Sequence, residues 1–198
     1  MLDEELNETA VKAKAISEIV EIALNNLGRV DLSREEALAG ILSQIAIQVD
    51  KKDLEFALGI DLAVDGAFLE MANYGPWKMV LVDRIPLAVE LMSPDEERVV
   101  FLTLRGFLSH PCERRFVEVD HGAIPYLMNG ADCMAAGIQN SEDGIRKGDP
   151  VWIRDEAHGR PLALGWALMD GGEMKKANNG KGIRTVHWVG DDLWSLDS

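Results

Sequence analysis

The side chains that could perform covalent or metal chemistry are few in this 198-residue chain, and their spacing does not suit such chemistry. Cys112 and Cys133 form no CxxC pair, and no two histidines have HxxxH or HExxH spacing, so we expect no metal site. Asp191-Asp192 lies near His187, but adjacent residues of an extended segment point to opposite faces. No GxxxxGK[ST], GxGxxG or GxSxG motif occurs. The sequence therefore predicts a protein that is not an enzyme and holds no cofactor.

Glycine-rich and aromatic positions offer a second kind of chemistry, the binding of a phosphate or a base. The segment Gly180-Lys181-Gly182 has the composition of a phosphate-binding loop, but three residues fit a structural turn better. Four tryptophans could stack on bases: Trp152, Trp166, Trp188 and Trp194. Those on predicted strands fit the core of a barrel better, because large aromatic rings are usually buried there.

The composition is that of a folded, acidic protein. Hydrophobic residues make up 47% of the chain, and 34 acidic against 20 basic residues give a formal charge of −14. No run approaches the roughly 18 apolar residues of a membrane span, and the acidic N-terminus lacks the basic region of a signal peptide. We therefore expect a cytoplasmic protein with reduced thiols and no membrane contact. Such a chain repels nucleic acid unless its basic residues cluster.

The apolar pattern changes along the chain from helical to strand-like periodicity. Spacings of three and four residues predict two amphipathic helices, at 13–27 and at 38–49. Residues 54–76 fit either a helix or a strand. Beyond them, short apolar runs at 78–82 and 87–91 predict a β-hairpin, and a further β-rich run covers 99–104.

The turn-forming segment Ser109-His110-Pro111 predicts a domain boundary. The chain beyond it alternates short apolar runs with glycine-containing turns, which predicts a small β-barrel. The strands are expected at 116–119, 151–154, 162–169 and 183–189, and short helices at 123–128 and around 173–175. Acidic residues are concentrated before the boundary. Residues 1–111 contain twenty acidic and ten basic residues, whereas residues 112–198 contain fourteen acidic and ten basic residues.

The ordered motifs of residues 116–194 resemble the PUA domain, an RNA-binding module. The matching pieces are 119–126, 129–134, 137–138, 148–151, 162–167, 173–174, 180–183, His187 and 190–194. The closing Gly-Lys-Gly, His and Asp-x-Leu-Trp pieces are similar to archaeal PUA-domain proteins related to the eukaryotic MCTS-type re-initiation factors and ligatin. In that group a pre-PUA domain precedes the PUA domain, and residues 80–88 and 102–108 resemble its central hairpin and the following Thr-Leu-basic-Gly turn.

The resemblance implies an α+β protein with a helical plus β-sheet pre-PUA-like domain at 33–111 and a PUA β-pseudo-barrel at 112–198. Residues 1–32 match no part of this group, so we expect them to form a helical N-terminal extension. PUA domains build their RNA face from the short helix, the loop after it and neighbouring strands. Carried onto this chain, the RNA-binding residues are Asn129, Gly130, Ala131, Met134 and Gly137, with Arg146, Lys147 and Lys181 as phosphate contacts. Glycine at such positions lets the backbone approach a phosphate or base closely.

The function implied by this resemblance is non-enzymatic RNA binding in translation. The RNA would be tRNA or small-subunit rRNA, engaged at initiation, re-initiation or recycling, and the small ribosomal subunit or a basic protein would be a further partner. Two alternatives stay open. One is a protein-interaction adaptor, which the charge of −14 favours, and the other is a targeting subunit of an RNA-modification or ribosome-biogenesis complex.

Overall fold

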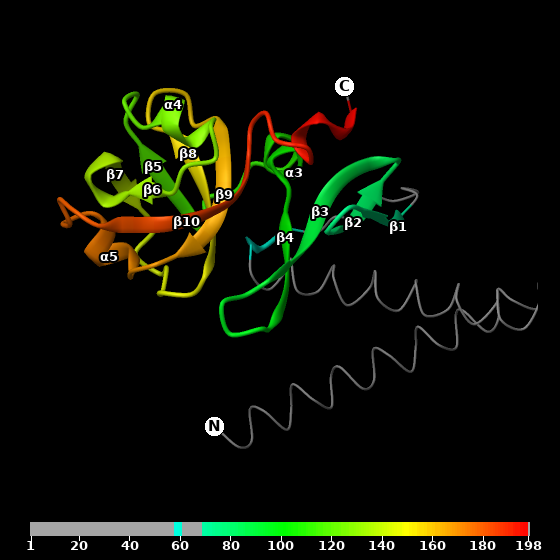
Figure 1. Cartoon of the computed structure of the whole chain (residues 1–198), viewed down its shortest axis with the longest axis horizontal. Coiled ribbons are helices and arrows are strands. Elements are labelled where there is room, and N and C mark those ends of the chain that lie inside the picture. The colour runs from blue at the N-terminus through cyan, green and yellow to red at the C-terminus, as the bar shows by residue number, and fades with distance from the viewer. Residues whose placement is uncertain (1–57, 61–68, 198) are drawn as a thin grey trace, which may run out of the picture. The chain divides into compact units, whose positions relative to one another are not determined.

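The computed structural model describes residues 58–60 and 69–197, all within one compact unit that spans Lys52–Ser198. This unit contains two β-sheets that follow each other along the chain (Figure 1). The predicted helices at 13–27 and 38–49 and the predicted extension at 1–32 lie outside the described residues. In the ambiguous segment at 54–76, a strand begins at Leu69.

The first sheet is an antiparallel meander of four strands in chain order. Its strands are β1 (Leu69–Tyr74), β2 (Trp77–Val82), β3 (Ile85–Met92) and β4 (Arg98–Leu102). The predicted hairpin is confirmed as β2 and β3, with a turn formed by Asp83 and Arg84, whose φ values of 51° and 71° fit the tight turns that match strand twist. Pro86 was expected in that turn but lies in β3, where a register shift opposite Leu81 accommodates it.

A short helix follows the first sheet and begins at Leu104, where the predicted β-rich run ends. The run at 99–104 leaves the sheet at Leu102, because Thr103 caps helix α3 (Leu104–Ser109). The Thr103 hydroxyl accepts a hydrogen bond from the Gly106 amide (3.0 Å) and donates one to the Pro86 carbonyl (2.7 Å). This side chain both starts the helix and ties it to β3.

The second sheet has six strands and curls into the predicted pseudo-barrel (Figure 1). The strands are β5 (Phe116–Val119), β6 (Cys133–Met134), β7 (Ile138–Ser141), β8 (Pro150–Asp155), β9 (Pro161–Ala167) and β10 (Lys181–Trp188), in the order β6-β10-β9-β8-β5-β7. Helices α4 (Ile124–Leu127) and α5 (Gly171–Met174) and the 3-10 turns η1 (Ala135–Gly137) and η2 (Trp194–Asp197) connect or follow them. The two outermost strands, β6 and β7, are joined directly by η1, which brings the ends of the sheet together.

Strands β8 and β9 face two different cores with their alternate residues. Val151 and Ile153 of β8 point into the barrel, whereas Trp152 between them packs with the residues of the first sheet. The ring of Phe107 on α3 stacks on Trp152 with centroids 4.6 Å apart. Trp152 and Trp166 are therefore buried, as predicted, but in the core that is shared with the first sheet and not inside the barrel.

Candidate functional site

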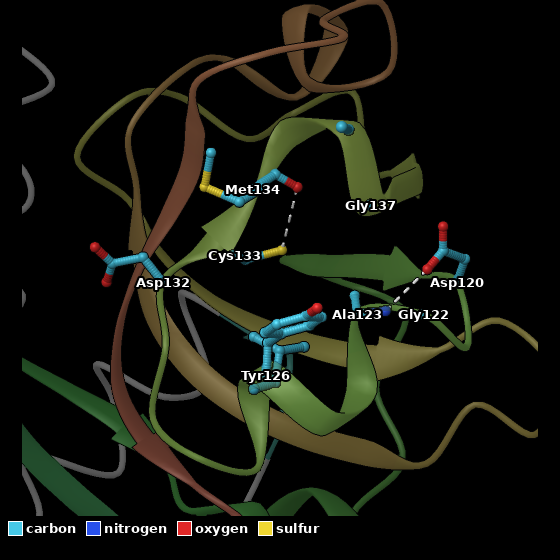
Figure 2. Close-up of a pocket in the computed structure, with 10 residues that line it drawn as sticks. Asp120, Gly122, Ala123, Tyr126, Asp132, Cys133, Met134 and Gly137 are labelled. Atoms are coloured by element: carbon cyan, nitrogen blue, oxygen red, sulfur yellow. Dashed lines mark hydrogen bonds between the residues drawn. The ribbon is translucent and has the colours of Figure 1, made fainter.

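A pocket of about 340 Å³ opens at the rim of the pseudo-barrel, between α4 on one side and the segment β6–η1 on the other (Figure 2). Most of its lining atoms are apolar, and the polar groups stand at its ends. The residues that line it are Asp120, Gly122, Ala123, Tyr126, Leu127, Asp132, Cys133, Met134, Ala136 and Gly137. Concave apolar sites with a few convergent polar groups are typical binding sites for small planar ligands.

Helix α4 is held at both ends by side-chain hydrogen bonds. The Asp120 carboxylate accepts a hydrogen bond from the Ala123 amide (3.0 Å) at its start. At its end, the side-chain amide of Asn129 donates to the Pro125 carbonyl (2.8 Å). The helix therefore presents Tyr126 at the mouth of the pocket in a fixed position, with 69% of its surface exposed.

The loop after α4 requires glycine at position 130 for two independent reasons. Gly130 has φ of +75°, a conformation that side-chain-bearing residues rarely adopt. A Cβ at this position would also lie 2.7 Å from the indole ring of Trp188 on β10. The loop therefore packs directly against β10 of the barrel. The Thr185 hydroxyl holds it there by donating a hydrogen bond to the Ala131 carbonyl (2.9 Å).

The opposite wall of the pocket is formed by β6 and η1. Met134 is 49% exposed and lies across the pocket from Tyr126, as Figure 2 shows. Gly137 keeps this wall close to α4, since a Cβ there would lie 3.1 Å from the Cβ of Ala123. A flat ligand that enters the pocket would therefore meet an aromatic ring on one side and a polarizable thioether on the other.

Two carboxylates stand at opposite ends of the pocket, Asp120 and Asp132 (Figure 2). The Lys181 ammonium lies 2.7 Å from Asp132 and, with the Thr185 amide, holds the pKa of that carboxyl below its usual range despite partial burial. Asp120 accepts hydrogen bonds from the Ala123 amide and from Gln139 (3.3 Å). A carboxylate oxygen has room for further acceptance, so Asp120 can receive a hydrogen bond from a ligand amino group.

The pocket is not equipped for nucleophilic or metal chemistry. Burial raises the pKa of the Cys133 thiol to about 12, with Asp120 and Asp132 adding to the effect, so the thiol is protonated at neutral pH. Within residues 58–60 and 69–197, no three His, Cys, Asp or Glu side chains are grouped so as to hold a metal ion. In the same part of the chain, no helix has the length and apolar character needed to cross a membrane.

The structure gathers most of the predicted binding residues around this pocket. Met134 and Gly137 line it, and the loop containing Asn129, Gly130 and Ala131 borders it. Lys181 is the β-sheet partner of Met134 and pairs with Asp132.

Arg146 and Lys147 lie in a different place, in the segment before β8. The Lys147 amide donates to Asp170, the N-cap of α5 (2.9 Å), and the Arg146 guanidinium lies 3.9 Å from the same carboxylate. Neither residue lines the pocket, so the structure does not bring them together with the other predicted residues.

Sequence reasoning missed two residues of the pocket, Tyr126 and Asp120. Tyr126 was part of the motif series but received no role of its own. The available signal was an aromatic residue on a very short helix that follows Pro125 and precedes Asn129-Gly130, because such a helix is too short to bury its whole surface. The role of Asp120 depends on the packing of α4 and η1 and had no local signal.

The similarity of this chain to known proteins covers more than the pseudo-barrel. The family model described as "PUA domain" matches residues 115–189. An uncharacterized protein of Methanocaldococcus jannaschii is 37% identical over 157 residues, which cover 78% of this chain and 94% of that protein. Translation machinery-associated protein 20 of Schizosaccharomyces pombe is 41% identical over 144 residues, 61% of this chain and 80% of that protein.

A solved structure shows the same arrangement in three dimensions. The crystal structure of a hypothetical protein from the hyperthermophilic archaeon Pyrococcus horikoshii superposes with a TM-score of 0.66 at 28% identity, covering 77% of this chain and 95% of that one. This similarity and the two sequence matches are longer than the segment matched by the family model, so they include residues outside the pseudo-barrel.

Proposed function

The chain belongs to the family of PUA-domain proteins that includes translation machinery-associated protein 20 and archaeal relatives, and from this premise we propose that it is a non-enzymatic RNA-binding protein that acts in translation, in the cytoplasm. Its RNA is tRNA or small-subunit rRNA, bound by the pocket between α4 and β6. Residues 33–111 and 112–198 serve as the pre-PUA-like and PUA domains of this assignment.

The observation that carries the proposal is the pairing of exposed Tyr126 with exposed Met134 across an apolar pocket. A single unstacked base is a flat apolar object with polar edges, and proteins bind such bases by stacking on aromatic side chains. Asp120 is placed to accept a hydrogen bond from an exocyclic amino group, which adenine, cytosine and guanine carry and uracil lacks. The pocket therefore favours an unpaired amino-bearing base.

The charge distribution makes base contacts more important than phosphate contacts here. The basic residues whose charge acts on Asp132 at the pocket are Lys181 and Arg184, and the ammonium of Lys181 is already paired with this carboxylate. Asn129 and Gly130 contribute backbone shape instead of charge. We therefore expect RNA affinity to depend on stacking and to vary little with salt, unlike the binding of a strongly basic protein.

The experiment compares two tyrosine variants, since the chain has only two tyrosines and both are exposed. Tyr126→Ala removes the ring at the pocket, and Tyr74→Ala removes the same side chain from the first sheet as a matched control. Loss of one stacked base costs about 1–3 kcal/mol, so Tyr126→Ala should weaken binding to tRNA or to small ribosomal subunits by about five- to 150-fold. Equal affinity of the two folded variants would place the RNA elsewhere.

A further inference from the structure

A second hollow, of about 680 Å³, lies between the two sheets of the described unit, away from the pocket under α4. One side is the β1–β2 turn with Tyr74 and Trp77. The other side is the end of β10 and the turn after it, with Trp188, Asp191 and Asp192. No residue is shared between the linings of the two pockets, so this groove is a separate site.

The groove combines aromatic surface with negative charge. Tyr74 is 46% exposed, and Trp77 and Trp188 are half-buried. The Asp191 carboxylate is fully engaged, since it receives hydrogen bonds from His187 (2.6 Å) and from the amides of Trp188 and Trp194. Asp192 differs, because it is exposed and makes no hydrogen bond or ion pair with the described residues.

The structure already shows which chemistry fits such a surface. Arg154 places its guanidinium 4.0 Å from the ring centre of Phe116 while it pairs with Glu113 and Glu118. Arg105 likewise lies 4.9 Å over the ring of Trp194. A planar guanidinium stacks on an aromatic face and pairs with a carboxylate at the same time, which a lysine ammonium does less well.

We propose that this groove binds an arginine side chain of a basic protein partner, stacked against Tyr74 and Trp77 and paired with Asp192. Charge complementarity selects this occupant: the groove has two carboxylates and no basic lining residue, so phosphates and RNA are repelled. Residues 1–57 of the chain itself contain twelve acidic and six basic residues, and such a segment does not match an acidic groove. The proposal is independent of the RNA-binding function.

The test titrates the full chain with a labelled, end-capped peptide of alternating glycine and arginine, and with its lysine counterpart. Asp192→Asn removes one exposed, unpaired charge and should weaken arginine-peptide binding by about threefold or more. Glu156→Gln, the same charge change at another exposed site, is the matched control and should leave binding unchanged. Tyr74→Ala should weaken binding of the arginine peptide and leave RNA binding unchanged. Tyr126→Ala should weaken RNA binding and leave peptide binding unchanged.

Three results would overturn the proposal. The first is equal loss in Asp192→Asn and Glu156→Gln, which would indicate attraction by overall charge. The second is equal affinity for the arginine and lysine peptides, which would remove the role of stacking. The third is wild-type affinity in Asp192→Asn. If Tyr74→Ala does not fold, Asp192→Asn alone tests the proposal. Trp188 is not substituted, because its indole ring lies against Gly130 in the loop after α4.

Discussion

Replacement of Gly130 by alanine tests the seating of the loop that borders the candidate pocket. A residue with a side chain in this left-handed conformation costs about 1–2 kcal/mol. The new Cβ would also overlap the Trp188 ring at 2.7 Å, and overpacking of this kind costs about 1–3 kcal/mol. The free energy of unfolding should therefore fall by about 2–5 kcal/mol. In a chain of this size, the melting temperature should fall by about 2–4 °C for each kcal/mol.

The two contributions can be separated in a double-mutant cycle with Trp188→Leu, which removes the indole ring. In that background Gly130→Ala should cost only the conformational 1–2 kcal/mol or so. Urea unfolding of the four proteins, compared at equal m-values, measures the difference. The reasoning is refuted if Gly130→Ala costs the same in both backgrounds.

Three further predictions concern single side chains. Thr103→Val should lower the free energy of unfolding by about 1–3 kcal/mol in urea, because α3 loses its cap and the Pro86 carbonyl its donor, while Thr103→Ser should recover most of this. Burial alone would raise the pKa of Asp191, but its hydrogen bonds to His187 and two backbone amides hold that pKa below its value in the unfolded chain. The stabilisation from Asp191 is therefore complete above the unfolded pKa and is lost as the pH falls through the folded pKa. Asp191→Asn should make the free energy of unfolding fall less steeply at acidic pH, and an unchanged fall would contradict this. Cys133 should resist alkylation at pH 8 until the protein unfolds, and rapid labelling in native buffer, read by mass spectrometry, would show the thiol to be accessible.

The sequence predicted the elements of the described part well where local patterns determine them. The hairpin of β2 and β3, the strands β5, β8, β9 and β10 and the short helices α4 and α5 all follow from apolar runs and turn residues, whereas the short outermost strands β6 and β7 were not predicted. The helix α3 was missed because its residues, Leu104 to Ser109, carry no helical stripe of useful length, and its start depends on a contact between Thr103 and Pro86, seventeen residues away.

The candidate site could be predicted only in part, for a similar reason. The loop residues Asn129 to Ala131 were predicted as RNA contacts because their motif is local and resembles that of PUA domains, and the structure places this loop beside the pocket. Arg146 and Lys147 were predicted as phosphate contacts from the family resemblance, and the structure places them beside Asp170, outside the pocket lining. The assignment of Trp152 to a shared core and the pairing of Tyr126 with Met134 both depend on how strands curl and pack. These contacts join residues that are distant in sequence, and a local sequence pattern does not specify such contacts.

The most direct test of the central claim, that this acidic protein binds RNA through a base-stacking pocket, is a salt series of wild-type binding to tRNA and to small ribosomal subunits. If Lys181 and Arg184, the basic residues whose charge acts on Asp132, each neutralise one phosphate, log affinity should fall with log salt with a slope of about −1.4, since each neutralised phosphate of a single strand contributes roughly −0.7. Saturable binding with this shallow slope is the predicted result. Absence of binding even at low salt, or a slope of many units, would contradict it.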